Sequence, residues 1–199
     1  MRYIIGIILF TVTASYAIEL PSDLRDGDII FQTSRSSQSI AIQRATKSPY
    51  SHVGIILFQN NKPYVFEAAS TVCYTPLDKW ISRGQGKKYV LKRLKEVSTH
   101  LSGSELKKAA KKFEGKPYDL TFEWSDEKIY CSELVWKMYY QALGIKVGEL
   151  QLLREFNLSD PVVKKKMRER YGKSVPLDEP VISPAAIFRS PLLIPVAQK

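Results

Sequence analysis

The stretch IYCSELVWKMYYQALG, Ile129 to Gly144, determines which folds and functions this chain allows. Cys131 follows two bulky residues and opens a run of helix-forming residues that ends at a glycine. Apolar side chains recur at helical spacing on two adjoining faces, and only a narrow polar stripe remains. The pattern predicts a helix that is buried over most of its circumference, with Cys131 at its N-terminus on the inward side.

Three roles are open to this cysteine: half of a disulfide, a small apolar core residue, or a nucleophile. The chain has two cysteines, Cys73 and Cys131, which permit one bridge, although exported domains held by disulfides usually carry more. The N-terminus of a helix carries partial positive charge and free N–H groups, which favour a thiolate and a developing oxyanion. The helix by itself does not decide between a core residue and a nucleophile.

A nucleophilic cysteine needs a base, and the chain has two histidines. His100 lies in the polar run STHLSGSE, typical of a solvated loop, whereas His52 opens the apolar strand SHVGIILF. Glu67 lies in a second apolar strand, PYVFEAA, where a carboxylate is costly without a partner.

The two strands form a predicted hairpin. A register that pairs Glu67 with His52, or slips by two residues, puts both side chains on one face, whereas a slip of one separates them. Taken singly, His52 could be a packed or capping residue and Glu67 a solvated residue at a strand edge. A Cys/His/acid constellation explains both together with Cys131. The scattered cysteines and histidines match no zinc spacing, so no metal is expected.

The rest of the pattern predicts an α+β chain with a small antiparallel sheet. The proline-rich, mostly apolar segment 174–195 is expected to wrap over the core. The expected strands are 29–31, 52–58, 63–69 and 88–94, and the further helices are 34–46, 102–113 and 161–170.

The first 17 residues, MRYIIGIILFTVTASYA, are typical of a secretory signal peptide. They contain Arg2, a short apolar run and small residues at Ser15 and Ala17, which predicts cleavage after Ala17 and export to the periplasm or the medium. Residues 18–199 then form one domain. An uncleaved N-terminal anchor is the alternative.

The chain carries 30 basic and 20 acidic residues, a formal net charge of +10. This balance favours anionic surroundings, and weak contact with a membrane or cell wall is one possibility. Nucleic acid is a poor candidate for an exported protein. The basic run Lys164, Lys165, Lys166, Arg168 and Arg170 is interpreted as the solvated face of a helix.

Five motifs, GDIIF, SHVGI, YVFEA, GKPYD and YCSELVWKMY, occur in this order between about Asp26 and Phe188. In them the chain resembles the permuted branch of the NlpC-type papain-fold cysteine hydrolases, most closely the YiiX/YebB-like bacterial family. The resemblance implies a circularly permuted papain-like α+β fold, in which a small antiparallel sheet packs on a central catalytic helix. It also implies Cys131 as nucleophile, His52 as general base and Glu67 as the group that orients His52.

Tyr50 and Tyr118 fall near motif positions and are candidates for substrate binding. The expected function is an exported thiol hydrolase that cleaves amide or ester bonds, without a cofactor, in cell-wall peptides or in N-acyl, lipid-like substrates. The sequence does not choose between these two classes: no wall-anchoring repeat is present, which weakens the first, and the apolar tail at 181–196 could frame an apolar pocket. The alternatives are a catalytically silent module that binds a peptide or lipid, and a structural protein with a Cys73–Cys131 bridge.

Overall fold

The computed structural model describes residues 21–95 and 99–199, and of residues 99–102 it describes the backbone only. The predicted signal peptide, residues 1–17, lies outside the described residues. Within the described ranges, no helix combines the length and the apolar character needed to cross a membrane.

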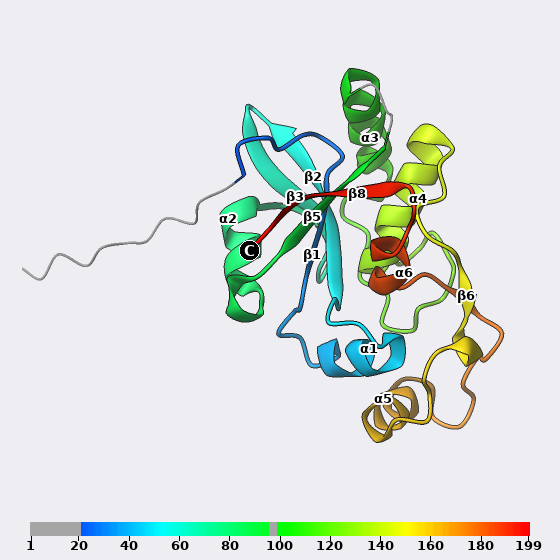
Figure 1. Cartoon of the computed structure of the whole chain (residues 1–199). Coiled ribbons are helices and arrows are strands. Elements are labelled where there is room, and N and C mark those ends of the chain that lie inside the picture. The colour runs from blue at the N-terminus through cyan, green and yellow to red at the C-terminus, as the bar shows by residue number, and fades with distance from the viewer. Residues whose placement is uncertain (1–20, 96–98) are drawn as a thin grey trace, which may run out of the picture.

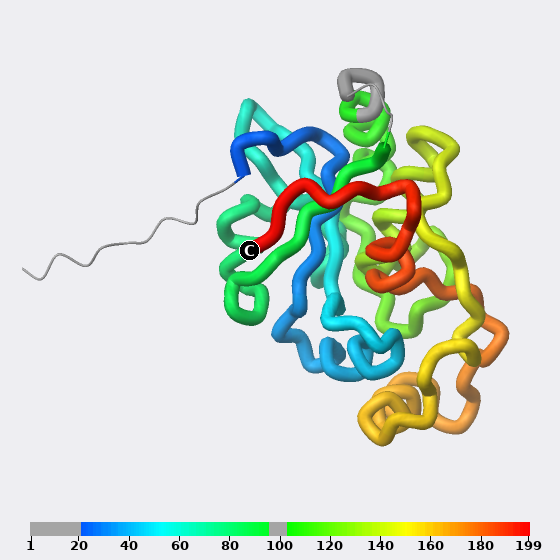
Figure 2. Tube along the Cα trace, viewed as in Figure 1, coloured from blue at the N-terminus to red at the C-terminus, as the bar shows by residue number. Residues whose placement is uncertain are grey.

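A six-stranded antiparallel sheet forms the centre of the molecule (Figure 1). Its strand order is β4-β3-β2-β1-β5-β8, so the C-terminal tail adds a strand at one edge. In Figure 2 the red end of the tube runs along the green segment of β5. The strands are β1 (Ile29–Gln32), β2 (His52–Gln59), β3 (Lys62–Ala68), β4 (Val72–Pro76), β5 (Val90–Leu94) and β8 (Leu193–Gln198).

Helices cover both faces of this sheet, α3, α4 and α6 on one side and α2 on the other (Figure 1). A second sheet has only two short strands, β6 (Gln151–Leu152) and β7 (Pro180–Val181). The helices are α1 (Ser39–Thr46), α2 (Leu77–Arg83), α3 (Thr99–Phe113), α4 (Cys131–Leu143), α5 (Pro161–Tyr171) and α6 (Pro184–Phe188), with 3-10 turns η1 (Gln85–Lys87) and η2 (Leu153–Glu155).

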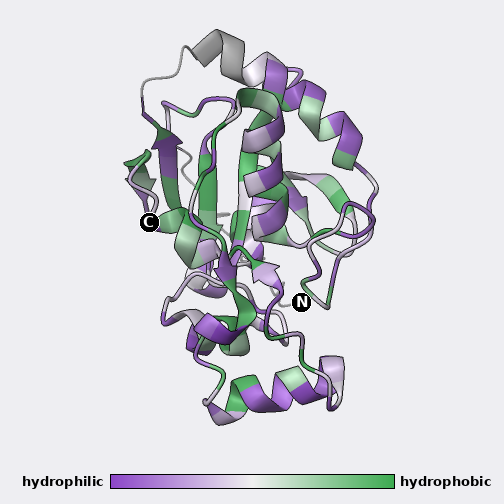
Figure 3. Cartoon of the chain, turned by 90° about the vertical axis from the view of Figure 1, so that its right-hand side faces the viewer, coloured by the Kyte–Doolittle hydropathy of each residue, from purple (hydrophilic) through white to green (hydrophobic). Residues whose placement is uncertain are grey.

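The core has two parts because side chains alternate across the strands. In β1, Ile29 and Phe31 belong to the large cluster that contains the apolar side of α4, whereas Ile30 packs in a smaller cluster with Trp80 of α2. In Figure 3 the green, apolar strands lie behind the helices, and α5 projects from the bottom of the molecule with mixed colouring. The predicted α+β class and antiparallel sheet are confirmed.

The β2–β3 hairpin is joined at Asn60 and Asn61, which have φ values of 47° and 60°. Two successive positive φ values are what a tight type I′ hairpin turn requires. The register pairs Ile55 with Phe66, and its continuation sets Gly54 opposite Glu67. His52 therefore lies two residues along β2 from the position opposite Glu67. An offset of two keeps the side chains of His52 and Glu67 on the same face of the sheet.

Gly54 is required at this crossing. A Cβ atom there would lie 2.4 Å from Cγ1 of Val65, closer than atoms can pack, and 3.0 Å from the carbonyl oxygen of Phe66, which is also tight. The absent side chain lets β3 approach β2 at the position of Glu67. The glycine of the SHVGI motif thus helps to bring the carboxylate to the histidine.

The aspartate of the GDIIF motif has a structural role. Asp28 is fully buried and accepts hydrogen bonds from Arg93 at 2.6 and 2.8 Å, which tie the start of β1 to β5. A buried carboxylate needs such partners to remain charged. This contact fixes the centre of the sheet and lies apart from the candidate site.

Several predicted boundaries are wrong. The helix predicted at 102–113 begins at Thr99, so the backbone of His100 is helical and not a loop. The helix expected at 34–46 begins only at Ser39. The segment 72–83, for which no element was predicted, forms β4 and α2.

Candidate active site

Three elements bring the predicted catalytic side chains together at one end of the sheet. Cys131 is the first residue of α4, His52 the first of β2, and Glu67 the sixth of the seven residues of β3. The cysteine is 2% exposed and the glutamate 0%. Both cysteines of the chain are free, so the alternative of a Cys73–Cys131 bridge is excluded.

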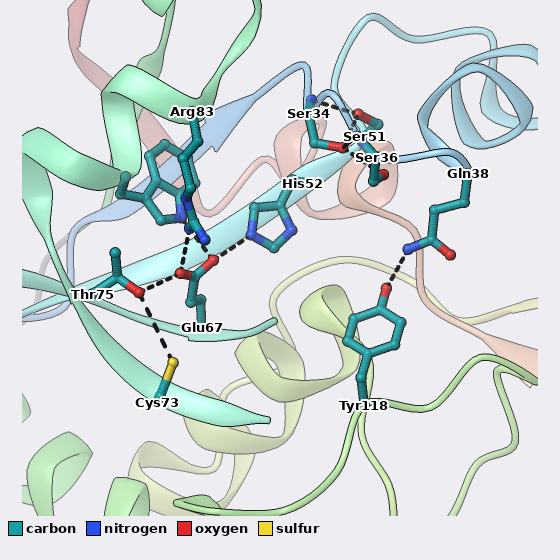
Figure 4. A network of polar contacts seen from close by, with 11 residues as sticks. Ser34, Ser36, Gln38, Ser51, His52, Glu67, Cys73, Thr75, Arg83 and Tyr118 are labelled. Atoms are coloured by element: carbon teal, nitrogen blue, oxygen red, sulfur yellow. Dashed lines mark hydrogen bonds and ion pairs between the residues drawn. The ribbon is translucent and has the colours of Figure 1, made fainter. Parts of the chain in front are cut away.

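His52 is held by Glu67 through one ring nitrogen. Nε2 of His52 lies 2.6 Å from Oε2 of Glu67. Figure 4 shows the second ring nitrogen pointing away from this carboxylate. Because the carboxylate can only accept from Nε2–H, it fixes the tautomer and the orientation of the ring.

Glu67 is surrounded by hydrogen-bond donors. Besides His52, it accepts from Oγ1 of Thr75 at 2.6 Å, from Nε1 of Trp80 at 3.0 Å and from Nη2 of Arg83 at 2.5 Å. Burial raises the pKa of Glu67, but the hydrogen bonds and charges of these partners more than offset it and lower this pKa to about 2. The carboxylate therefore remains ionised in a buried site.

The Cys131 thiol and the His52 imidazole form a coupled pair. Burial raises the pKa of Cys131, but hydrogen bonding to His52, the charge of His52 and the backbone N–H groups of Val53 and Ser132 lower it overall. For His52 the effect of burial has the opposite sign and lowers the pKa. The hydrogen bonds and charges of Cys131 and Glu67 outweigh it and raise the pKa of His52 to about 10. The site thus favours a thiolate beside an imidazolium at neutral pH.

Two cavities meet at this pair. An apolar cavity of about 60 Å³ lies against Cys131 and is closed on one side by Val181, Ile182 and Pro184 of the tail. A polar groove of about 1120 Å³ is lined by His52, Arg35 and several serines. Four side chains, Gln38, Tyr118, Lys166 and Arg170, line both spaces.

The structure separates the two tyrosines proposed for substrate binding. Tyr118 lines both cavities, and Nε2 of Gln38 donates to its hydroxyl at 2.8 Å. Tyr50 instead packs against the rings of Phe31 and Phe188, with centroid distances of 5.8 and 4.3 Å, and is not among the residues that line either cavity.

The interpretation of the α5 basic run as a solvated face is wrong for two of its residues. Lys164, Lys165 and Arg168 are exposed, as expected. Lys166 and Arg170 are half-buried and line the cavities. The two are four residues apart and therefore lie on the same side of the helix.

Sequence reasoning also missed Thr75, Trp80 and Arg83, the partners of Glu67. They come from β4 and α2, the segment without a predicted element. The available signal was the sequence TPLDKWISR, in which a proline precedes a short helical pattern.

Comparison with known proteins agrees with this geometry. The family model described as permuted papain-like amidase enzyme, YaeF/YiiX, C92 family, matches residues 23–196. A protein of Escherichia coli (strain K12), named uncharacterized protein YiiX, is 54% identical over 173 residues, which cover 87% of this chain and 86% of that protein. A crystal structure titled metalloprotein yiiX, from Escherichia coli O157:H7, has a TM-score of 0.86 and 54% identity, and the match covers 88% of this chain and 97% of that chain.

The permuted papain-like class of fold is defined by an antiparallel sheet, a cysteine as the first residue of the packed helix, and a histidine that precedes this cysteine in the sequence. This chain has all three features. The chain belongs to the YaeF/YiiX family of permuted papain-like amidases, C92. The predicted family and fold are thereby confirmed.

The word metalloprotein in that title is said of the Escherichia coli protein. Among the side chains that the structure describes, in residues 21–95 and 103–199, no three of His, Cys, Asp or Glu lie close enough together to hold a metal ion. The carboxylate of the candidate site already accepts from four donors, His52, Thr75, Trp80 and Arg83. Such an environment does not fit a metal ligand, which must keep its lone pairs for the cation.

Proposed function

We propose that this protein is an exported thiol amidase that cleaves N-acyl substrates with an apolar acyl group. Cys131 is the nucleophile, His52 the proton carrier and Glu67 the group that orients His52. The observation that supports this proposal is the 2.6 Å contact from Glu67 to His52, beside a buried thiol whose pKa is lowered. The export step rests on the signal-peptide pattern of residues 1–17.

In the first step the Cys131 thiolate forms a bond to the carbonyl carbon of the amide, and the π electrons move to the carbonyl oxygen. The N–H groups at the start of α4 are available to stabilise the oxyanion. When the carbonyl re-forms, the C–N bond breaks and the His52 imidazolium gives its proton to the leaving nitrogen. The products of this step are a free amine and a thioester on Cys131.

In the second step water attacks the thioester. Neutral His52 accepts a proton from the water as the C–O bond forms, and the C–S bond then breaks. The acyl group leaves as a carboxylic acid, and the thiolate–imidazolium pair is restored. Glu67 carries its charge throughout and stabilises the imidazolium state of the ring.

The arrangement of the two cavities supports the assignment of the substrate's halves. Cys131 lines the apolar cavity and His52 lines the polar groove. A carbonyl bound to the thiol thus has its acyl chain in the apolar cavity, and its nitrogen faces the proton carrier and the groove. This favours N-acyl, lipid-like substrates with a polar amine portion over cell-wall peptides, which have few apolar groups to fill the cavity.

The test uses two probes on the same preparation. Iodoacetamide at pH 6–7 reports the Cys131 thiolate, and p-nitrophenyl acetate, butyrate and octanoate report acyl transfer and chain preference. We expect rapid labelling of Cys131, turnover that improves from acetate to butyrate, and complete loss of both in Cys131→Ala. Cys73→Ala is the matched control, because that thiol lines neither cavity, and it should behave as wild type.

Thermal melts of both variants separate loss of chemistry from loss of folding. A correctly folded Cys131→Ala that retains turnover would contradict the nucleophile. Turnover without preference for the longer acyl chains would contradict the acyl pocket but leave the thiol mechanism intact. Absence of labelling and turnover in wild type would favour a binding module.

A further inference from the structure

A chain of side chains runs from α5 to the candidate active site, and it begins at Arg170. This guanidinium is half-buried, lies 4.6 Å over the ring of Phe122 and donates through Nη2 to Oε1 of Gln38. Within the described residues it forms no ion pair with a carboxylate. Burial lowers its pKa, although the arginine remains a cation at any ordinary pH. Partial burial of a cation without a counter-ion costs free energy. The position of Arg170 therefore suggests that this side chain has a function.

Gln38, which directly precedes α1, forms the second link. Its amide oxygen is committed to Arg170, because a guanidinium can only donate. The NH₂ end must therefore face the other way, and Nε2 donates to the hydroxyl of Tyr118 at 2.8 Å. A flipped amide would set NH₂ against the guanidinium and lose this hydrogen bond, so Arg170 fixes the direction of the chain.

Tyr118 is the third link. Its hydroxyl has a single proton, and since the oxygen accepts from Gln38, that proton is free to point elsewhere. Burial raises the pKa of Tyr118 well above its usual value, and the negative charge of Cys131 raises it further, which keeps the hydroxyl protonated.

The backbone fixes Tyr118 in this place. It forms a parallel bridge with Ile129, two residues before Cys131, and its N–H donates to the carbonyl oxygen of Ser70 at 3.0 Å. The tyrosine side chain and the thiol then line the same apolar cavity. A carbonyl group attacked by the thiol comes within reach of the tyrosine hydroxyl.

We propose that Arg170 and Gln38 are positioning residues that direct the Tyr118 hydroxyl toward the carbonyl oxygen of the substrate, where it is the side-chain donor to the oxyanion. The inference rests on the proposed function. A donor that is oriented before the reaction stabilises developing charge without reorganisation. The guanidinium at the far end of the chain strengthens both hydrogen bonds, because successive hydrogen bonds polarise one another.

The proposal gives α5 two faces with different roles. Arg170 belongs to the side that faces the cavities, and the exposed Arg168 belongs to the solvated side. The two arginines have the same chemistry and lie on one helix, two residues apart. Arg168→Met is therefore the matched control for Arg170→Met.

The experiment measures kcat and KM for p-nitrophenyl butyrate and, separately, the rate of alkylation by iodoacetamide. Alkylation needs the thiolate but forms no oxyanion. We expect Tyr118→Phe to lower kcat by about 10²- to 10³-fold, as loss of one oxyanion donor does, with KM and the alkylation rate changed less than about threefold. Arg170→Met and Gln38→Leu should each lower kcat by roughly tenfold, on the scale of one charge-assisted hydrogen bond.

The double variant Tyr118→Phe/Arg170→Met tests the chain itself. If Arg170 acts through Tyr118, the double variant has the kcat of Tyr118→Phe alone. Multiplicative losses, or an alkylation rate that falls in parallel with kcat, would overturn the proposal, since Arg170 would then act on folding or on the thiolate. Arg168→Met should match wild type.

The two levels of inference fail in different ways. A wild-type protein with neither labelling nor turnover overturns the proposed function and the chain with it. Full turnover in wild type and in Tyr118→Phe overturns the chain alone. Thermal melts accompany each variant, and Gln38→Glu adds a second check. Its carboxylate can only accept, so the Tyr118 hydroxyl should donate to it and turn its proton away from the substrate, while the contact to Arg170 is kept and kcat falls.

Discussion

Two glutamates of this protein are completely buried, yet their pKa values move in opposite directions. Glu67 on β3 has its pKa lowered to about 2, and Glu133 on α4 has its pKa raised to about 8. Burial raises the pKa of both. The difference lies in the partners that each carboxylate receives.

Glu67 accepts from four side chains, two of which, His52 and Arg83, carry or share positive charge. Glu133 has one cation, Lys137, at 2.8 Å, and one backbone donor, the N–H of Tyr130 at 3.3 Å. Lys137 also contacts Asp126 at 2.7 Å. Its charge is therefore divided between two carboxylates, and the burial of Glu133 is incompletely offset.

The comparison shows that burial alone does not decide how a carboxylate acts. At the end of the sheet, donors hold a negative charge where a histidine needs it. One turn into α4, a similar carboxyl group favours its neutral form and helps to cap the helix. Substitutions at the two sites should therefore have opposite profiles in activity and in stability.

The largest effect is expected at Glu67. Glu67→Gln keeps the shape but replaces one acceptor oxygen with an NH₂ group. Each oxygen faces an obligate donor, Trp80 on one side and Arg83 on the other, so either amide orientation sets donor against donor. We expect Gln to lose as much activity as Ala, on the order of 10²- to 10⁴-fold in kcat.

The pH dependence of alkylation checks this prediction. In wild type the pKa of His52 is raised to about 10, partly by Glu67, so the imidazolium that stabilises the thiolate should persist until the pH rises through about 10. Without the carboxylate the pKa of His52 falls toward the ordinary histidine value of about 6.5, and the thiolate loses the imidazolium that stabilises it. The rise of the alkylation rate with pH should therefore move to higher pH, toward the ordinary thiol value of about 8.5. Identical alkylation profiles in wild type, Glu67→Gln and Glu67→Ala would contradict the role of Glu67 in the site.

How far these sites follow from sequence differs between them. His52, Glu67 and Cys131 could be predicted because each breaks a local pattern: a polar residue in an apolar strand, or a cysteine at a helix start. The donors to Glu67 could not, because they become its neighbours only through the β3–β4 pairing and the packing of α2. The segment that carries them has five- and seven-residue elements, too short for a clear periodicity.

Two further features depended on tertiary structure. The tail residues of β8 include Pro195 and pair only at a sheet edge, where proline is tolerated, so composition suggested a wrapped segment instead of a strand. The basic run of α5 predicts a solvated position for Arg170, because a charge run gives no sign that one member faces a cavity. Such a residue is identified only when the helix is placed against Gln38 and Phe122.

A middle-sized effect is expected at Glu133, in stability and not in activity. A carboxyl group with its pKa raised from about 4.5 to about 8 contributes stability that is full below about pH 4.5 and is lost as the pH rises through about 8. Glu133→Gln resembles the neutral acid and does not titrate. Relative to wild type, its free energy of unfolding should therefore increase between pH 5 and pH 9, by up to a few kcal/mol.

Urea denaturation at several pH values measures this difference directly. We expect kcat of Glu133→Gln to stay within about threefold of wild type, since the side chain contacts Lys137 and Tyr130 rather than the thiol or the imidazole. A pH-independent stability difference would show that Glu133 is ionised in the folded protein. A kcat loss as large as that of Glu67→Gln would remove the contrast between the two carboxylates.

The smallest effect is expected at Arg83, the solvent-facing partner of Glu67. Arg83 is the last residue of α2, and its side chain is 49% exposed. Its Nη2 donates to Oε1 of Glu67 at 2.5 Å. Exposed ion pairs contribute little because water and salt screen them. Arg83→Met should therefore raise the pKa of Glu67 only slightly and lower kcat by less than about tenfold, while Thr75 and Trp80 keep their hydrogen bonds to the carboxylate.

Arg83→Lys is the matched variant, because it keeps the charge and changes the geometry of the donor. We expect Lys to lie between wild type and Met at low salt, and the three proteins to converge as the salt concentration rises and the charge is screened. The comparison uses kcat and the alkylation profile at about 20 mM salt, where charges are weakly screened, and at about 500 mM salt, where they are strongly screened. If Arg83→Met instead matches Glu67→Ala, then the ionised state of Glu67 depends on this one exposed cation, and the buried donors that distinguish Glu67 from Glu133 are insufficient to hold its charge.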